Sequence, residues 1–183
     1  MKGLIVEGPS DRAFVLELAK RLRANVKVRM AGRGWRKIAA YVRELLTSGC
    51  DSVMVLLDSH CSDPEAWSRF VSGKLRGQGL GPYMGDGRLK LCVAIHALEA
   101  WLLADEKALA DLLKKEVKVP VSPSKPCKPD EELDRVFCRA TGSRKRYNKG
   151  LRDIRELARR LSLEEVSRKC PSFADLVAFL KDI

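Results

Sequence analysis

The sequence lacks a long apolar run, a signal-peptide layout and any closely spaced pair of cysteines. No stretch approaches the roughly 18 apolar residues that a membrane-spanning helix needs, so we expect no membrane contact. The N-terminus enters a strand pattern at once, which favours a cytoplasmic protein. A chain of 183 residues is long enough to bury one substantial core.

The six cysteines form no CxxC pair and show no zinc-finger spacing. Cys50 and Cys92 lie in apolar contexts that are typical of buried thiols. Cytosolic proteins keep their thiols reduced, except in hyperthermophiles. We therefore expect reduced cysteines.

Acidic residues are scarce in two segments, so the net charge of +11 is unevenly distributed. The segment from Lys20 to Arg43 holds nine Lys and Arg and no acid, and the segment from Cys138 to Arg160 holds nine more. Each cluster alone fits a solvated helix face, but two in one small protein favour a polyanionic partner, nucleic acid above all. The candidate nucleic-acid-binding residues are Arg33, Arg36, Lys37, Arg144, Lys145 and Arg146.

Short apolar strands alternate with amphipathic helices four times along the first part of the chain. This alternation predicts an α/β fold with a mostly parallel central sheet of about four strands. Residues 77–87 are rich in glycine and predict a mobile segment. The expected strands cover residues 2–6, 25–30, 52–57 and 88–95, and the expected helices cover residues 10–23, 35–47, a span up to about 77, and 98–113.

The composition of the sequence changes after residue 116. Residues 117–130 contain four prolines and predict an extended connection between two parts of the chain. Residues 131–183 are basic and helical in pattern. We expect them to form a C-terminal subdomain that packs on the core of residues 1–116.

Carboxylates follow three of the expected strands. Glu7 ends the first strand, Asp58 ends the third, and Glu99 lies just beyond the fourth; Asp11 is in the first turn of the helix after the first strand. In a parallel sheet these ends share one edge, where ligand sites collect. Clustered carboxylates suit a hard cation such as Mg²⁺ or Mn²⁺, and paired ions of this kind recur in phosphodiester chemistry.

Each of these residues also has a simpler interpretation. Asp11 could be only a helix N-terminal acid that the helix dipole favours, and Glu99 could face solvent. A carboxylate that ends a buried strand, such as Glu7 or Asp58, is costly to bury without a ligand. Residues 32–34, a GRG before a helix, could cradle a phosphate or form a plain turn.

Several motifs resemble known proteins. EGPSD after the first strand, VLLDSH after the third and the basic helical tail resemble the Toprim fold of topoisomerases, bacterial primases, small recombination proteins and overcoming-lysogenization-defect nucleases. HALEAWLLAD (96–105) is similar to the hallmark of a Toprim-like family, domain of unknown function 4276. The later KP, Y-x-K and SF residues fit that family too: Lys128-Pro129, Tyr147 with Lys149, and Ser172-Phe173.

The resemblance covers nearly the whole chain and implies a Rossmannoid, Toprim-like core. It also implies that Glu7 and Asp11 match the metal-binding acids of the nuclease branch. Asp58 matches the first Asp of the DxD motif, but His60 stands where the second Asp is expected. Either Asp63 takes over that role or His60 is itself a ligand. Glu99 matches the acid after the fourth strand.

The function implied is a metal-dependent nuclease for DNA or RNA that uses Mg²⁺ or Mn²⁺. Glu7 and Asp58 would be catalytic, with Lys149 supplying a cation near the scissile phosphate. The resemblance also implies a partner ATPase.

His60 supports an alternative, a non-catalytic nucleic-acid-binding module with a degenerate site. Asp58-Ser-His60 also reads as the DxH of a metallophosphoesterase, but the GDxxD and GNH motifs of that class are absent.

Overall fold

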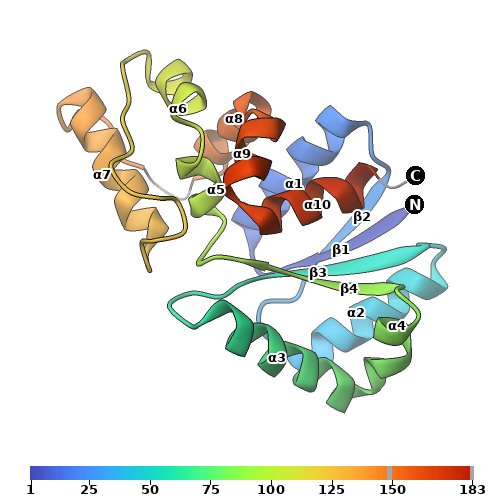
Figure 1. The fold of residues 1–183 in the computed structure, drawn as a ribbon. Helices are drawn as coiled ribbons and strands as arrows, with labels where there is room; N and C mark the ends of the chain where they lie inside the picture. The colour runs from blue at the N-terminus through green and yellow to red at the C-terminus, as the bar shows by residue number, and fades with distance from the viewer. Residues whose placement is uncertain (148–149, 182–183) are drawn as a thin grey trace.

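The computed structural model of the protein describes residues 1–147 and 150–181 and shows a parallel sheet between two layers of helices (Figure 1). The sheet has the strand order β2-β1-β3-β4, and every neighbouring pair is parallel. The predicted α/β fold with a parallel sheet is therefore confirmed. The strands are β1 (Lys2–Val6), β2 (Val26–Met30), β3 (Ser52–Asp58) and β4 (Leu89–Ala94).

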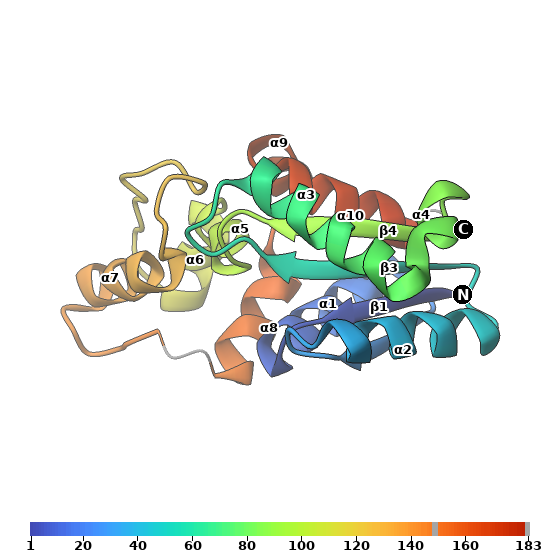
Figure 2. The same cartoon turned by 90° about the horizontal axis from the view of Figure 1, so that it is seen from below.

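Helices cover both faces of the sheet. In Figures 1 and 2, α1, α8, α9 and α10 lie on one face, and α2, α3 and α4 lie on the other, while α5, α6 and α7 lie beyond the carboxyl end of the strands. The helical elements are α1 (Pro9–Leu22), α2 (Trp35–Thr47), α3 (Pro64–Leu75), the π-helical turn η1 (Arg76–Leu80), α4 (Gly81–Gly85), α5 (Glu99–Leu103), α6 (Glu106–Leu113), α7 (Pro129–Thr141), α8 (Leu151–Arg160), α9 (Leu163–Lys169) and α10 (Pro171–Lys181).

The central strands are buried on both faces because each face has its own helical layer. All described residues of β3 except Asp58 are buried, as expected for a continuous apolar strand inside a parallel sheet. Gly3 lets α2 approach β1 closely: a Cβ there would lie 3.0 Å from Val53 Cγ2 and 3.1 Å from Leu45 Cδ1.

The helices after residue 128 share one hydrophobic core with the sheet and α1. Phe14 of α1, Trp101 of α5 and Phe173 of α10 pack ring against ring, with centroids 5.4–6.3 Å apart. The indole Nε1 of Trp101 donates a hydrogen bond to Ser172 Oγ at 3.2 Å. Trp101 is 1% exposed, so it packs in the core as the sequence predicts.

Two local predictions were wrong. The expected helix 98–113 is two helices, because Asp105 ends the first and caps the second by accepting a hydrogen bond from Ala108 N–H at 2.9 Å. The segment 77–87, where no helix was expected, contains most of η1 and all of α4, because the fully buried Leu80 anchors this segment to the core. No helix in the described part of the chain is long and apolar enough to span a membrane.

One ion pair joins α1 to α8 and should make stability depend on pH. Arg159 donates from Nε and Nη2 to the two carboxylate oxygens of Glu17, each at 2.9 Å. This hydrogen bond lowers the pKa of Glu17, against the opposing effect of burial. The ionised carboxylate therefore favours the folded state.

We expect Glu17→Gln to lower the melting temperature at pH 7. The stabilisation is fully present above the unfolded pKa of about 4.3 and is lost as the pH falls through the lower folded pKa. The difference between variant and parent should therefore shrink steadily as the pH falls below about 4.3, as followed by circular dichroism. Glu65→Gln removes a carboxylate that is 86% exposed and should change little. A deficit of Glu17→Gln that stays constant as the pH falls would contradict this assignment.

Candidate active site at the carboxyl edge of the sheet

Four of the predicted carboxylates line one pocket at the carboxyl end of the strands. The pocket has a volume of about 320 Å³. It lies among the ends of β1 and β3, the first turns of α1 and α5, and the turn after β2. Its lining comprises Glu7, Gly8, Ser10, Asp11, Gly32, Arg33, Asp58 and Glu99.

Glu7 follows β1 and accepts hydrogen bonds from residues at or just beyond the ends of the two neighbouring strands. Its Oε1 accepts a hydrogen bond from the backbone N–H of Asp58 at 3.0 Å, and its Oε2 accepts one from Arg33 Nε at 3.1 Å. The Glu7 side chain is only 17% exposed, so the charge is desolvated and needs these partners. A carboxylate has about four lone-pair sites, and these two bonds leave it able to accept further ligands.

Asp11 and Asp58 line the same pocket as Glu7. Asp11 Oδ2 accepts a hydrogen bond from Gly8 N–H at 2.8 Å, which stabilises the first turn of α1. The interpretation of Asp11 as a helix N-terminal acid therefore holds, but the residue also lines the pocket. Asp58 is the last residue of β3 and is half-buried.

Glu99 faces the pocket and not the solvent. It is 4% exposed, and its Oε1 accepts a hydrogen bond from the Tyr147 hydroxyl at 3.2 Å. Burial and the neighbouring Glu99 carboxylate raise the pKa of Tyr147, so the phenol stays protonated and remains a donor. Reasoning from strand ends did not find Tyr147, although the tyrosine of the Y-x-K pattern was a usable signal.

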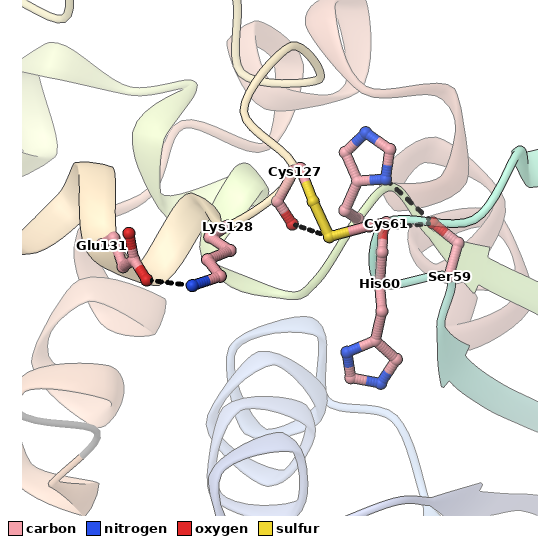
Figure 3. The surroundings of a disulfide bond; sticks show 7 residues. Ser59, His60, Cys61, Cys127, Lys128 and Glu131 are labelled. Atoms are coloured by element: carbon pink, nitrogen blue, oxygen red, sulfur yellow. Dashed lines mark hydrogen bonds and ion pairs between the residues drawn. A yellow bond between two sulfur atoms is a disulfide. The ribbon is translucent and has the colours of Figure 1, made fainter.

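The structure places His60 near Glu7 and Asp63 at the start of α3. His60 Nε2 lies 3.9 Å from Glu7 Oε2, and Figure 3 shows the imidazole pointing away from the neighbouring disulfide. Asp63 is exposed and caps α3, since its Oδ1 accepts a hydrogen bond from Ala66 N–H at 2.8 Å. The geometry therefore brings His60 beside the carboxylates and leaves Asp63 in a capping role.

The first basic cluster reaches the pocket through Arg33. The turn that carries it is fixed by Gly32, whose φ of 58° favours glycine and whose N–H donates to the Glu7 carbonyl at 3.1 Å. Arg36 and Lys37 follow in the first turn of α2, where both are exposed.

The second basic cluster directly precedes Tyr147, the residue that bonds Glu99. Its members Arg144, Lys145 and Arg146 line a cavity of about 970 Å³. Lys145 Nζ lies 3.0 Å from Asp153 Oδ1, and Arg146 Nη1 lies 2.7 Å from Asp134 Oδ2.

These ion pairs neutralise part of the positive charge of the second cluster. Lys149, expected near the scissile phosphate, lies outside the described residues.

A disulfide joins the loop after β3 to the proline-rich segment. Cys61 and Cys127 are bonded with Cα atoms 4.8 Å apart, and both residues are exposed (Figure 3). The expectation of reduced cysteines was therefore wrong for this pair. Its members are 66 residues apart, and only the folded chain brings them together.

The other described cysteines are free thiols. Burial raises the pKa of Cys92 to about 12, which fits its expected role as an inert core residue.

The donor chemistry of the pocket suits a hard divalent cation. Carboxylate oxygens are the ligands that Mg²⁺ and Mn²⁺ prefer, and Glu7, Asp11, Asp58 and Glu99 supply them from four different elements. Within residues 1–147 and 150–181, however, no three His, Cys, Asp or Glu side chains are grouped closely enough to hold an ion as they stand. Metal binding would therefore require these side chains to rotate towards one another.

Fold and pocket define the protein as a parallel α/β protein with an acidic site at the carboxyl edge of its sheet. The chain belongs to the family described as Domain of unknown function (DUF4276), which matches residues 6–181. Its fold is similar to that of the C-terminal region of the Burkholderia pseudomallei OLD protein, with a TM-score of 0.53 and 16% identity over 99% of this chain and 97% of that one. The family match confirms the resemblance to domain of unknown function 4276 expected from the sequence, and the likeness to the OLD region concerns the fold. A search of curated proteins finds no match.

The disulfide should stabilise the fold by restricting the unfolded chain. In the chain-entropy model, closing a loop of 66 residues lowers the entropy of the unfolded chain and so raises its free energy by roughly 4 kcal/mol at room temperature. We therefore expect Cys127→Ser to melt earlier than the parent in oxidising buffer and together with it after reduction by dithiothreitol.

Cys138→Ser is the control for this prediction, because Cys138 is a free, half-buried thiol. It should melt like the parent under both conditions. Titration of six free thiols in the unreduced, denatured parent would contradict the disulfide, which leaves Cys50, Cys92, Cys138 and Cys170 free.

Proposed function

We propose that the protein is a divalent-metal-dependent nuclease that cleaves phosphodiester bonds in DNA or RNA. The observation that carries the proposal is the convergence of Glu7, Asp11, Asp58 and Glu99 on one pocket beside the Arg33 guanidinium. Clustered acids repel one another at neutral pH, so the arrangement is stable when a cation is shared among them. The likeness of the fold to the OLD C-terminal region is consistent with this class.

The residues of the pocket, Tyr147 beside it and the expected Lys149 would have different roles. Glu7, Asp11, Asp58 and Glu99 would hold Mg²⁺ or Mn²⁺, which when bound supplies Lewis-acid activation for attack on phosphorus. Arg33 orients the Glu7 carboxylate through its 3.1 Å hydrogen bond and offers its remaining N–H groups to a phosphate oxygen. Tyr147 holds Glu99 in place. Lys149 would add a second cation.

The basic residues of both clusters would bind the polymer. Arg36 and Lys37 on α2 and Arg144 before Tyr147 are exposed. Such contacts act on phosphates and are independent of base sequence. A partner ATPase, implied by the family resemblance, and a cytoplasmic location belong to the same proposal.

Cleavage should require both a divalent ion and Asp58. We expect the purified protein to nick plasmid or cut oligonucleotides with Mg²⁺ or Mn²⁺ and to be inactive in EDTA. Asp58→Asn should reduce the rate by at least about 100-fold, the upper end of the range for losing a residue that merely orients a metal ligand.

Asp63→Asn is the matched control for this experiment. It makes the same change of carboxylate to amide three residues after His60, and asparagine is an equally good N-cap for α3. Its activity should equal that of the parent. Equal loss in both variants would mean that Asp63 belongs to the site, and activity retained in Asp58→Asn would refute the proposed site.

A non-catalytic nucleic-acid-binding module is the second candidate function. It is favoured by His60 in place of the second acid and by the absence of a three-ligand group among the residues that the structure describes. This candidate predicts binding of nucleic acid without turnover under any metal condition.

His60 should set the preference among metals if the site is active. Imidazole is a softer ligand than carboxylate and suits Mn²⁺ better than Mg²⁺. We expect His60→Asp to raise the Mg²⁺-supported rate relative to the Mn²⁺-supported rate. Aspartate tolerates the φ of 48° at this position, so the backbone should be preserved. An unchanged ratio of initial rates would place His60 outside the metal site.

A further inference from the structure

Three aromatic side chains form a cluster on the α2 and α3 layer, close to the candidate site. Trp35 begins α2, and Trp67 and Phe70 lie on α3. Trp67 and Phe70 are stacked, with centroids 5.4 Å apart and planes inclined by 23°. Trp35 meets Phe70 edge to face at 6.0 Å. We call these residues the aromatic cluster.

The aromatic cluster extends beyond the core on which it rests. Trp35 and Trp67 pack against the buried residues between α2, α3 and the sheet. Phe70 lies on the outside and is 46% exposed, one of few large apolar side chains in the described chain with so much exposed surface. Core packing thus explains the two tryptophans and leaves the exposed ring of Phe70 unexplained.

Cations surround the aromatic cluster. The Arg33 guanidinium lies 5.7 Å from the centroid of the Trp67 ring, and Lys74 Nζ lies 5.1 Å from the centroid of Phe70. Arg36 and Lys37 are exposed directly after Trp35. These side chains place positive charge beside the aromatic rings.

Arg33 connects the aromatic cluster to the carboxylate pocket. The same guanidinium bonds Glu7 through Nε at 3.1 Å and lies over Trp67. The Arg33 side chain would therefore lie between a ligand on Trp67 and the Glu7 carboxylate.

We propose that the aromatic cluster binds unpaired bases of single-stranded nucleic acid and presents that strand to the carboxylate pocket. Base-on-ring stacking is tolerant of sequence, and the flanking cations suit the phosphates of the strand. Bases in a duplex are already stacked on one another and offer no free face to Phe70. The inference rests on the proposed function and adds a substrate class to it: single strands, overhangs or flaps.

The cations argue against a protein partner on this surface. A dry protein interface would bury the ammonium of Lys74 and the guanidinium of Arg33, at a desolvation cost that matched anions must offset. A polyanion brings those anions with it. Nucleic acid is therefore the ligand whose bases can stack on the rings and whose phosphates can pair with the cations.

Binding without cleavage tests the proposal directly. A fluorescently labelled oligothymidylate and a duplex of the same length are titrated with protein in EDTA, and anisotropy gives both affinities. The parent should bind the single strand more tightly. Phe70→Ala should weaken single-strand binding by roughly 5- to 100-fold and leave duplex binding unchanged.

Two further substitutions at Phe70 separate stacking from apolar contact. Phe70→Trp keeps a π face and should bind the single strand at least as well as the parent. Phe70→Leu keeps the apolar bulk without a ring, and its affinity should fall as in Phe70→Ala. Circular dichroism confirms that each variant is folded.

Tyr83→Ala is the matched control. Tyr83 lies on α4, ahead of the amino end of β4, and also carries a cation, with the Arg88 guanidinium 4.9 Å from its ring centroid. Its removal should leave single-strand binding unchanged, because it lies at the opposite end of the strands from the carboxylate pocket.

Single-strand binding that is unchanged in Phe70→Ala would overturn the inference. Parent-like single-strand affinity of Phe70→Leu would overturn it too. If the parent self-associates with rising concentration and Phe70→Ala does not, the surface belongs to a second copy of the chain. Metal-dependent cleavage that does not depend on Phe70 would refute this inference alone. Phe70-dependent binding without any cleavage would refute the proposed nuclease and keep the single-strand surface.

Discussion

The Glu7 carboxylate joins the ends of three adjacent strands, and the geometry of the candidate site depends on it. One oxygen holds the backbone N–H of Asp58 at the end of β3, and the other holds Arg33 in the turn after β2. Glu7 itself follows β1, the strand between these two. A desolvated carboxylate is costly without partners, so these two bonds keep the charge in place and also fix the positions of the groups around the pocket.

Charge of opposite sign is segregated around this point. The acids converge on the pocket, while basic residues lie at the start of α2 and in the segment before Tyr147. Part of the positive charge is already used internally, as in the pairs of Lys145 with Asp153 and Arg146 with Asp134. The net charge of +11 therefore overstates what is available to a polyanion.

The C-terminal part of the chain completes the site as well as the core. Tyr147 reaches back to Glu99, and Cys127 tethers the proline-rich segment to the loop that carries His60. Residues from both ends of the chain also share one hydrophobic cluster around Phe14, Trp101 and Phe173. The pocket is thus built on a scaffold to which distant segments contribute, which suits a site that must position several acids at once.

Local patterns in the sequence were enough to determine the parallel sheet, because alternating strands and helices leave few possible topologies. They also placed Glu7, Asp11, Asp58 and Glu99 at one edge, because the carboxyl ends of parallel strands lie at the same edge of the sheet. They missed the break at Asp105 and the turns around Leu80, where a cap and a buried anchor override helix and loop propensity. Only the tertiary structure decided that His60, and not Asp63, lies beside Glu7. It alone paired Cys61 with Cys127 and brought Trp35 against Phe70. These outcomes rest on contacts between segments far apart in sequence or on the rotation of single side chains, and no local pattern encodes either.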